Sequence, residues 1–105
     1  MTRLYIVVRS TLTAGQKIAQ ACHALSAFAH RHAALYAEWF TTSNTIVILE
    51  VPSEQALTSL KWEAMGRELA YATFLEPDLV DFEPLTAIAF EPRSASMLRA
   101  LPLVQ

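Results

Sequence analysis

Residues 4–30 decide the fold, and they read LYIVVRSTLTAGQKIAQACHALSAFAH. The segment opens on a continuous apolar run at residues 4–8 that is rich in β-branched side chains, which is typical of a buried strand. A polar connection follows, and Thr11 or Thr13 can cap the helix that begins after it. A buried strand followed directly by a long helix indicates an α/β domain.

The helix has two distinct faces when its residues are placed at 100° intervals. The apolar face consists of Ala14, Ile18, Ala21, Cys22, Leu25, Phe28 and Ala29. The opposite face consists of Gln16, Gln20, His23 and His30, and Lys17 lies at the edge between the two. We therefore expect Ile18, Cys22 and Leu25 to pack on a sheet, and the polar face to meet solvent, a cleft or a partner.

The rest of the chain continues in short alternating elements. We expect helical structure at residues 32–40, strands at 45–51, 70–75 and 86–90, and a short helix at 94–99. Between the second and third strands, Ser53 is the expected N-cap of a helix that ends near Gly66. The inner face of that helix is expected to consist of Leu57, Leu60, Ala64 and Met65.

The order strand, helix, helix, strand, helix, strand, strand predicts a single α/β domain over residues 1–105. Helical crossovers favour parallel strands, and the closing strand pair can be antiparallel, which gives a mixed sheet. A ferredoxin-like sandwich fits less well, because it needs a hairpin in the middle of the chain and this chain has its hairpin at the end.

Charge is distributed unevenly along the chain. The net charge of −2 argues against broad, charge-driven binding of nucleic acid. Residues 1–37, however, contain Arg3, Arg9, Lys17 and Arg31 and no acidic residue, whereas residues 76–91 contain five acidic residues and no basic one. A phosphate-bearing ligand is therefore expected to meet the first third of the chain.

Composition excludes several kinds of protein. The single cysteine, Cys22, excludes an internal disulfide and a cysteine-based zinc site, and no Gly-rich phosphate loop is present. The first apolar run is too short to span a membrane. We expect a cytoplasmic protein without cofactor, metal or membrane contact. An apolar fraction of 53% indicates either that some surface is buried in a homodimer or that the core is rich in alanine.

Candidate functional residues come first from the long helix. Gln20 and His23 are neighbours on one face, and a histidine titrates near neutrality. Lys17 can hold a phosphate or an oxyanion as a point charge, and Gly15 lets a ligand approach the start of the helix. Each also has an ordinary structural explanation as a solvated or hydrogen-bonded side chain.

Three further candidates come from the last two strands. Glu76 and Asp78 flank Pro77 at the end of the third strand, where open α/β sheets bind ligands, and a carboxylate there can act as a general base or orient a lysine. Thr86 can donate a hydrogen bond from the last strand. The plain alternatives are a solvated acidic turn and an ordinary strand threonine.

Taken together, the order and these motifs resemble the type 2 peptidyl-tRNA hydrolases. Residues 4–9, followed by Gly15, Gln20 and His23-Ala24, resemble the opening strand and the Gly-x-x-x-Ala-Gln-x-x-His-Ala helix of that family. The stretch TIVILEVPS at residues 45–53 resembles its second strand and the next helix start. FLEPD at residues 74–78, with TAIA at 86–89, resembles a bacterial and phage branch that has a Glu-Pro-Asp turn.

The resemblance implies a four-stranded mixed sheet flanked by helices on both faces, usually as a homodimer. It also implies metal-free hydrolysis of the ester between a peptide and the terminal ribose of tRNA. The catalytic candidates are Lys17, Gln20, His23, Glu76, Asp78 and Thr86, and the substrate-binding candidates are Arg9, Gly15 and Gln16. Asp78 is the bolder choice for orienting water, with Glu76 pairing with Lys17.

The chain departs from the best-known members at three places. Gln16 stands where they have lysine, and Thr11 stands where they have aspartate. Glu76-Pro77-Asp78 replaces an Asp-Ala-Gly-x-Thr segment. Two other functions therefore stay open, namely a non-catalytic homodimeric module that binds a nucleotide or a tRNA end, and a protein-interaction domain.

Overall fold

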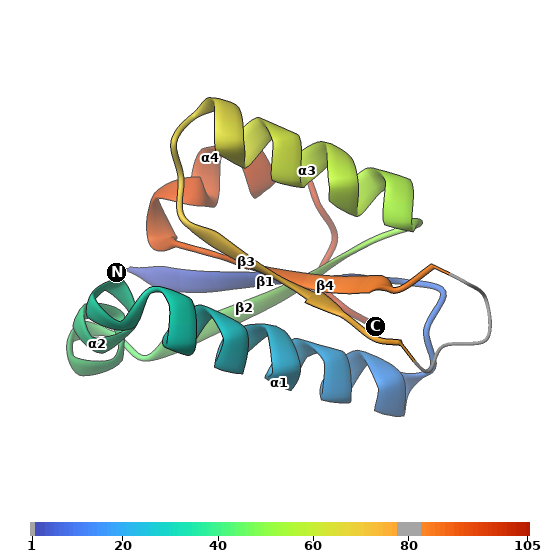
Figure 1. Ribbon diagram of the computed structural model, residues 1–105, viewed down its shortest axis with the longest axis horizontal. Helices are drawn as coiled ribbons and strands as arrows, with labels where there is room; N and C mark the ends of the chain where they lie inside the picture. Colours follow the sequence, from blue (N-terminus) through green and yellow to red (C-terminus); the bar gives the residue numbers. More distant parts are fainter. Residues whose placement is uncertain (1, 78–82) are drawn as a thin grey trace.

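The first strand lies inside the sheet, at the centre of the molecule (Figure 1). The structure is a computed structural model that describes residues 2–77 and 83–105. The elements follow the predicted order (Figure 1). They are β1 (Arg3–Arg9), α1 (Ala14–Arg31), α2 (Ala33–Thr42), β2 (Thr45–Val51), α3 (Glu54–Gly66), β3 (Tyr71–Leu75), β4 (Leu85–Phe90), a 3-10 turn (Pro92–Ser94) and α4 (Ala95–Leu98).

The four strands form one mixed sheet in the order β2-β1-β4-β3. β1 is parallel to β2, and β4 is antiparallel to both of its neighbours. Helices α1 and α2 cover one face of the sheet, and α3 and α4 cover the other (Figure 1). The predicted fold class, a four-stranded mixed sheet with helices on both faces, is confirmed.

The tail after α4 attaches to the outer edge of β2. The Glu50 N–H donates to Pro102 O at 3.0 Å, and the Val104 N–H donates to Ile48 O at 3.0 Å. These bonds satisfy part of the free edge of β2, which would otherwise expose unpaired backbone groups.

Two hydrophobic cores lie on the two faces of the sheet. On the α1 side, Leu4, Ile6 and Val8 alternate along β1 and pack with alanines of α1 and β4. On the α3 side, the core consists mainly of Val7, Leu49, Val51, Leu57, Ile88, Phe90 and Leu98. Small side chains on both α1 and β4 let the helix lie close to the sheet.

The predicted inner face of α1 is confirmed at Ala21 and Phe28 and wrong at Ile18 and Cys22, and the true inner face is turned by about one residue, or about 100°. Ile18 is 66% exposed and Cys22 is also exposed, whereas Leu25 is partly buried. The buried residues of the helix are Lys17, Gln20, Ala21, Ala24 and Phe28. The cause is that two polar side chains face inward, where each has a hydrogen-bond partner, and a hydrophobicity pattern assigns such residues to the outside.

The caps of the helices follow the sequence signals. Thr13 caps α1 in a reciprocal capping box with Gln16, and Ser53 Oγ accepts from the Ala56 N–H at the start of α3. Gly66 ends α3 as predicted. Met65, which was expected on the inner face of α3, is 48% exposed.

No helix in residues 2–77 and 83–105 is long and apolar enough to cross a membrane.

Candidate active site

An irregularity in β4 turns Thr86 toward α1. Phe74 of β3 pairs with Ala87, but the next residue, Leu75, pairs with Leu85. β4 therefore advances by two residues where β3 advances by one. Thr86 is the extra residue of this bulge. Regular alternation would aim it to the same face as Ile88, whereas the bulge re-aims it toward the opposite face, which α1 covers.

Thr86, Gln20 and Glu76 form a continuous hydrogen-bonded chain. The Thr86 hydroxyl donates to Gln20 Oε1 at 2.6 Å, and Gln20 Nε2 donates to Glu76 Oε1 at 3.1 Å. Thr86 is fully buried and Gln20 is 5% exposed, while Glu76 is only half-buried. The chain therefore runs from the core of the sheet to a carboxylate near the surface.

The direction of this chain is fixed by chemistry. An ionised carboxylate only accepts hydrogen bonds, so the amide of Gln20 must present its NH₂ group to Glu76. The amide oxygen then points to Thr86, whose hydroxyl must be the donor. Each member is thus oriented by the next, and Gln20 Nε2 orients one oxygen of the Glu76 carboxylate.

Backbone contacts hold Glu76 at the end of β3. Its N–H donates to Pro84 O at 2.7 Å, which closes the connection between β3 and β4. β3 runs in the same direction as β1, so its carboxyl end lies at the edge of the sheet where α1 begins (Figure 1). This is the placement that was expected for the carboxylate.

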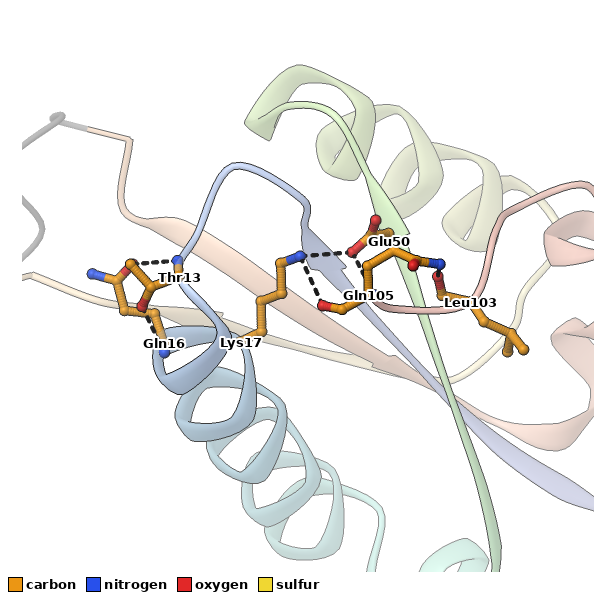
Figure 2. A network of polar contacts seen from close by, with 6 residues as sticks. All are labelled: Thr13, Gln16, Lys17, Glu50, Leu103 and Gln105. Atoms are coloured by element: carbon orange, nitrogen blue, oxygen red, sulfur yellow. Dashed lines mark hydrogen bonds and ion pairs between the residues drawn. The ribbon is translucent and has the colours of Figure 1, made fainter.

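Lys17 belongs to a separate network, shown in Figure 2. Its Nζ lies 2.9 Å from Glu50 Oε2 and donates to Gln105 O at 3.3 Å, and the Gln105 N–H donates to the same Glu50 oxygen at 3.3 Å. The hydrogen bond from Lys17, together with that from Gln105, holds the pKa of the Glu50 carboxyl below its usual value. One ion pair joins the helix to the strand here, and two hydrogen bonds of the Gln105 backbone join the tail to both.

The expected pairing of Lys17 with Glu76 is therefore wrong. Glu50 on β2 takes the ammonium instead, because both side chains point into the same narrow space between α1 and the tail (Figure 2). An acidic residue within the apolar run TIVILEV was the available signal, since a charge in a buried strand needs a partner.

His23 lies one helical turn beyond Gln20 and stacks on Phe74. The two ring centroids are 4.4 Å apart and the planes differ by 14°. His23 itself is exposed. Phe74 was not singled out from the sequence, because a phenylalanine in a strand is ordinarily a core residue.

The remaining predicted residues lie apart from the hydrogen-bonded chain of Thr86, Gln20 and Glu76. Arg9 is 1% exposed, and its guanidinium donates to the Glu83 carboxylate at 2.9 Å and to Glu83 O at 3.0 Å. Gln16 is engaged in the cap of α1, and a Cβ at Gly15 would meet open space. The predicted role of Asp78 lies outside the described residues. Among the described residues, no cluster of three or more His, Cys, Asp or Glu side chains could hold a metal ion.

Comparison with known proteins identifies the family of this chain. The family model of peptidyl-tRNA hydrolase PTH2 matches residues 2–101. The chain belongs to the PTH2 family. A solved structure of a protein of unknown function from Agrobacterium tumefaciens strain C58 is similar to it, with a TM-score of 0.69 over 99% of this chain and 98% of the other. The two are 12% identical, so that likeness concerns the fold. A search of curated proteins found no match.

Lowering the pH should weaken the attachment of the tail to β2 in this PTH2 member. Because the pKa of Glu50 is lowered by folding, the Lys17–Glu50 pair stabilises the tail above the ordinary pKa, near 4.5, and this stabilisation is lost as the pH falls through the lowered pKa. Protection of the Val104 and Gln105 amides from hydrogen exchange, corrected for intrinsic rates, should fall over that range.

Two variants check the cause at neutral pH. Glu50→Gln should reproduce the loss of protection, whereas Glu38→Gln, at an exposed position on α2, should leave it unchanged. Equal protection in the parent and in Glu50→Gln would show that the ion pair does not hold the tail.

Proposed function

We propose that this PTH2-family protein hydrolyses the ester bond between a peptide, or an N-blocked aminoacyl group, and tRNA. The observation that carries the proposal is the directed chain from Thr86 through Gln20 to Glu76. It supports a role for the Glu76 carboxylate as a general base or a water-positioning group. Family membership supplies the substrate class.

Glu76 is the proposed catalytic residue. Its carboxylate takes a proton from a water molecule, whose oxygen attacks the carbonyl carbon of the ester. The bond between that carbon and the ribose oxygen then breaks, and the proton passes to the ribose oxygen. The products are a peptide with a free carboxylate and a tRNA with a free terminal hydroxyl group.

Gln20 and Thr86 are proposed as positioning residues. Both are buried, so they act on the reaction through Glu76. Lys17 would have to leave Glu50 and Gln105 before it could approach a developing oxyanion, and it is therefore not assigned a role in the reaction.

Release of peptide from purified peptidyl-tRNA tests the proposal. The protein should accelerate deacylation above the protein-free rate, and the rate should be the same with and without a metal chelator. Deacylation no faster than the protein-free rate would reject the proposed function. Complete loss of activity with the chelator, restored by added metal, would reject the metal-free mechanism.

Replacing Thr86 tests its positioning role. Thr86→Val leaves Gln20 Oε1 without its buried donor, which should cost about 1–3 kcal/mol of stability. Turnover should fall by about tenfold or more, because a small misplacement of a reacting group is costly. Thr86→Ser keeps the hydroxyl and should restore both.

A split between kcat and affinity separates positioning from simple destabilisation. Under conditions in which Thr86→Val is fully folded, its kcat should fall while its affinity for tRNA stays close to that of the parent. A variant that is less stable but keeps the parent's kcat when folded would limit Thr86 to a structural role.

We also propose that the protein is a homodimer. Ile18 on α1 is 66% exposed, and Leu103 in the tail is 62% exposed. An apolar hollow of about 280 Å³ lies between α1 and the tail, and Ile48 and Val104 line it beside Ile18. Exposed apolar patches of this kind can mark protein–protein contacts, and a second copy of the chain would bury this one.

Light scattering at micromolar concentration should give twice the mass of the 11.7 kDa chain. Ile18→Glu should shift the protein toward the monomer, because it places a charge in the apolar contact. A strict monomer in the parent would contradict the dimer.

A further inference from the structure

A groove lies along α1 and begins one helical turn past Gln20, at His23. Its volume is about 510 Å³, and it lies between the second half of the helix and the end of β3. The lining residues are His23, Ser26, Ala27, His30, Arg31, Thr73, Phe74 and Leu75.

The contacts between helix and strand fix the order of residues along the groove. Gln20 meets Glu76, His23 stacks on Phe74, and just past the groove His32 Nε2 lies 2.9 Å from Tyr71 O. Helix and strand therefore run in opposite directions. Starting from Glu76, a ligand in the groove meets the His23–Phe74 stack first and His30 and Arg31 last.

The far half of the groove favours an anion. His30 and Arg31 are exposed and contribute hydrogen-bond donors, Arg31 carries a positive charge, and none of the described lining residues is acidic. The whole of α1 contains no Asp or Glu. His30 and Arg31 belong to the first third of the chain, which contains basic but no acidic residues, and both line this groove.

The near half of the groove offers a platform for a planar ring. The His23 ring is nearly parallel to Phe74 beneath it, and His23 is exposed. Proteins recognise single-stranded RNA by stacking its bases on such aromatic side chains and holding its phosphates with basic ones.

The spacing fits a short single strand. His23 and His30 are seven residues apart, which is about 10 Å along a helix. Stacked nucleotides advance by about 3.4 Å each along one strand, so this distance corresponds to about three nucleotides.

We propose that this groove holds the single-stranded, ester-bearing end of the RNA part of the substrate. The terminal base stacks on the His23–Phe74 platform, and the phosphates of the preceding nucleotides lie at His30 and Arg31. The proposal rests on the proposed function, since it directs the ester of the terminal ribose toward Glu76.

Binding of deacylated tRNA, followed by fluorescence anisotropy, tests the groove without requiring hydrolysis. His23→Ala should weaken binding by about 5- to 100-fold, as expected for loss of one base–aromatic stack, and His23→Phe should retain affinity within a few-fold. Arg31→Ala should make the slope of log affinity against log salt less steep by about 0.7. The matched control is Arg99→Ala, an exposed arginine just past α4 on the other face of the sheet, which should leave the slope unchanged.

The outcomes separate this proposal from the proposed function. Equal effects of Arg31→Ala and Arg99→Ala, or unchanged affinity in His23→Ala, would overturn the groove even if the parent hydrolyses peptidyl-tRNA. No binding of tRNA to the parent would overturn it as well. Binding that depends on His23 and Arg31 in a protein without hydrolase activity would support the groove and reject the proposed function.

Discussion

Replacing Glu76 by glutamine should lower the turnover of peptidyl-tRNA by about 10²–10⁴-fold, the usual contribution of a positioned acid or base. Glutamine has nearly the same shape, and its amide oxygen can still accept from Gln20 Nε2. The variant therefore loses the negative charge and the proton-accepting group while keeping the hydrogen bond. Single-turnover deacylation measures the loss, and tRNA affinity should stay close to that of the parent.

Glu63→Gln is the matched control for this substitution. Glu63 lies on α3, on the opposite face of the sheet, where it pairs with Arg67. This variant should keep the parent's rate. If Glu76→Gln also keeps the rate, the role assigned to Glu76 is wrong, and Asp78→Asn becomes the next variant to test.

Phe28→Ala should destabilise the protein by about 3–5 kcal/mol, the cost of emptying the space of a buried aromatic ring. Phe28 is fully buried among Leu4, Ile6 and the alanines of α1. For a domain of this size, such a loss is a large part of the total stability. Chemical denaturation followed by circular dichroism measures it as a shift of the midpoint.

Cys22→Ala provides the comparison on the same helix. Cys22 is exposed, so its replacement should change stability by less than about 0.5 kcal/mol. The sequence pattern alone places Cys22 inside, which makes the pair of variants a test of the helical phase. A larger loss in Cys22→Ala than in Phe28→Ala would contradict the observed orientation of α1.

The order of elements was predictable because each one has a strong local signal. Residues 4–8 show a buried strand, Thr13 and Ser53 cap helices, and Gly66 ends one. The inner face of α1 was not predictable in the same way. Lys17 and Gln20 are buried because partners on other elements satisfy them, and no local pattern reveals a partner that is distant in the sequence.

The candidate site was also predictable only in part. Gln20, Glu76 and Thr86 were predicted as candidates, and the structure places them in one chain of hydrogen bonds. The bulge that turns Thr86 toward Gln20 depends on the register between β3 and β4, which the sequence does not specify. The attachment of Lys17 to Glu50 likewise depends on the position of the tail on β2.

Hydrolysis of peptidyl-tRNA in ¹⁸O-labelled water tests the central claim most directly. The parent protein should release peptide faster than the protein-free reaction, with one ¹⁸O atom in the new carboxylate and none in the terminal ribose of the tRNA. Glu76→Gln should slow this release by about 10²–10⁴-fold. Release by the parent at the protein-free rate, or label in the ribose, would contradict attack of water on the ester carbonyl by this protein.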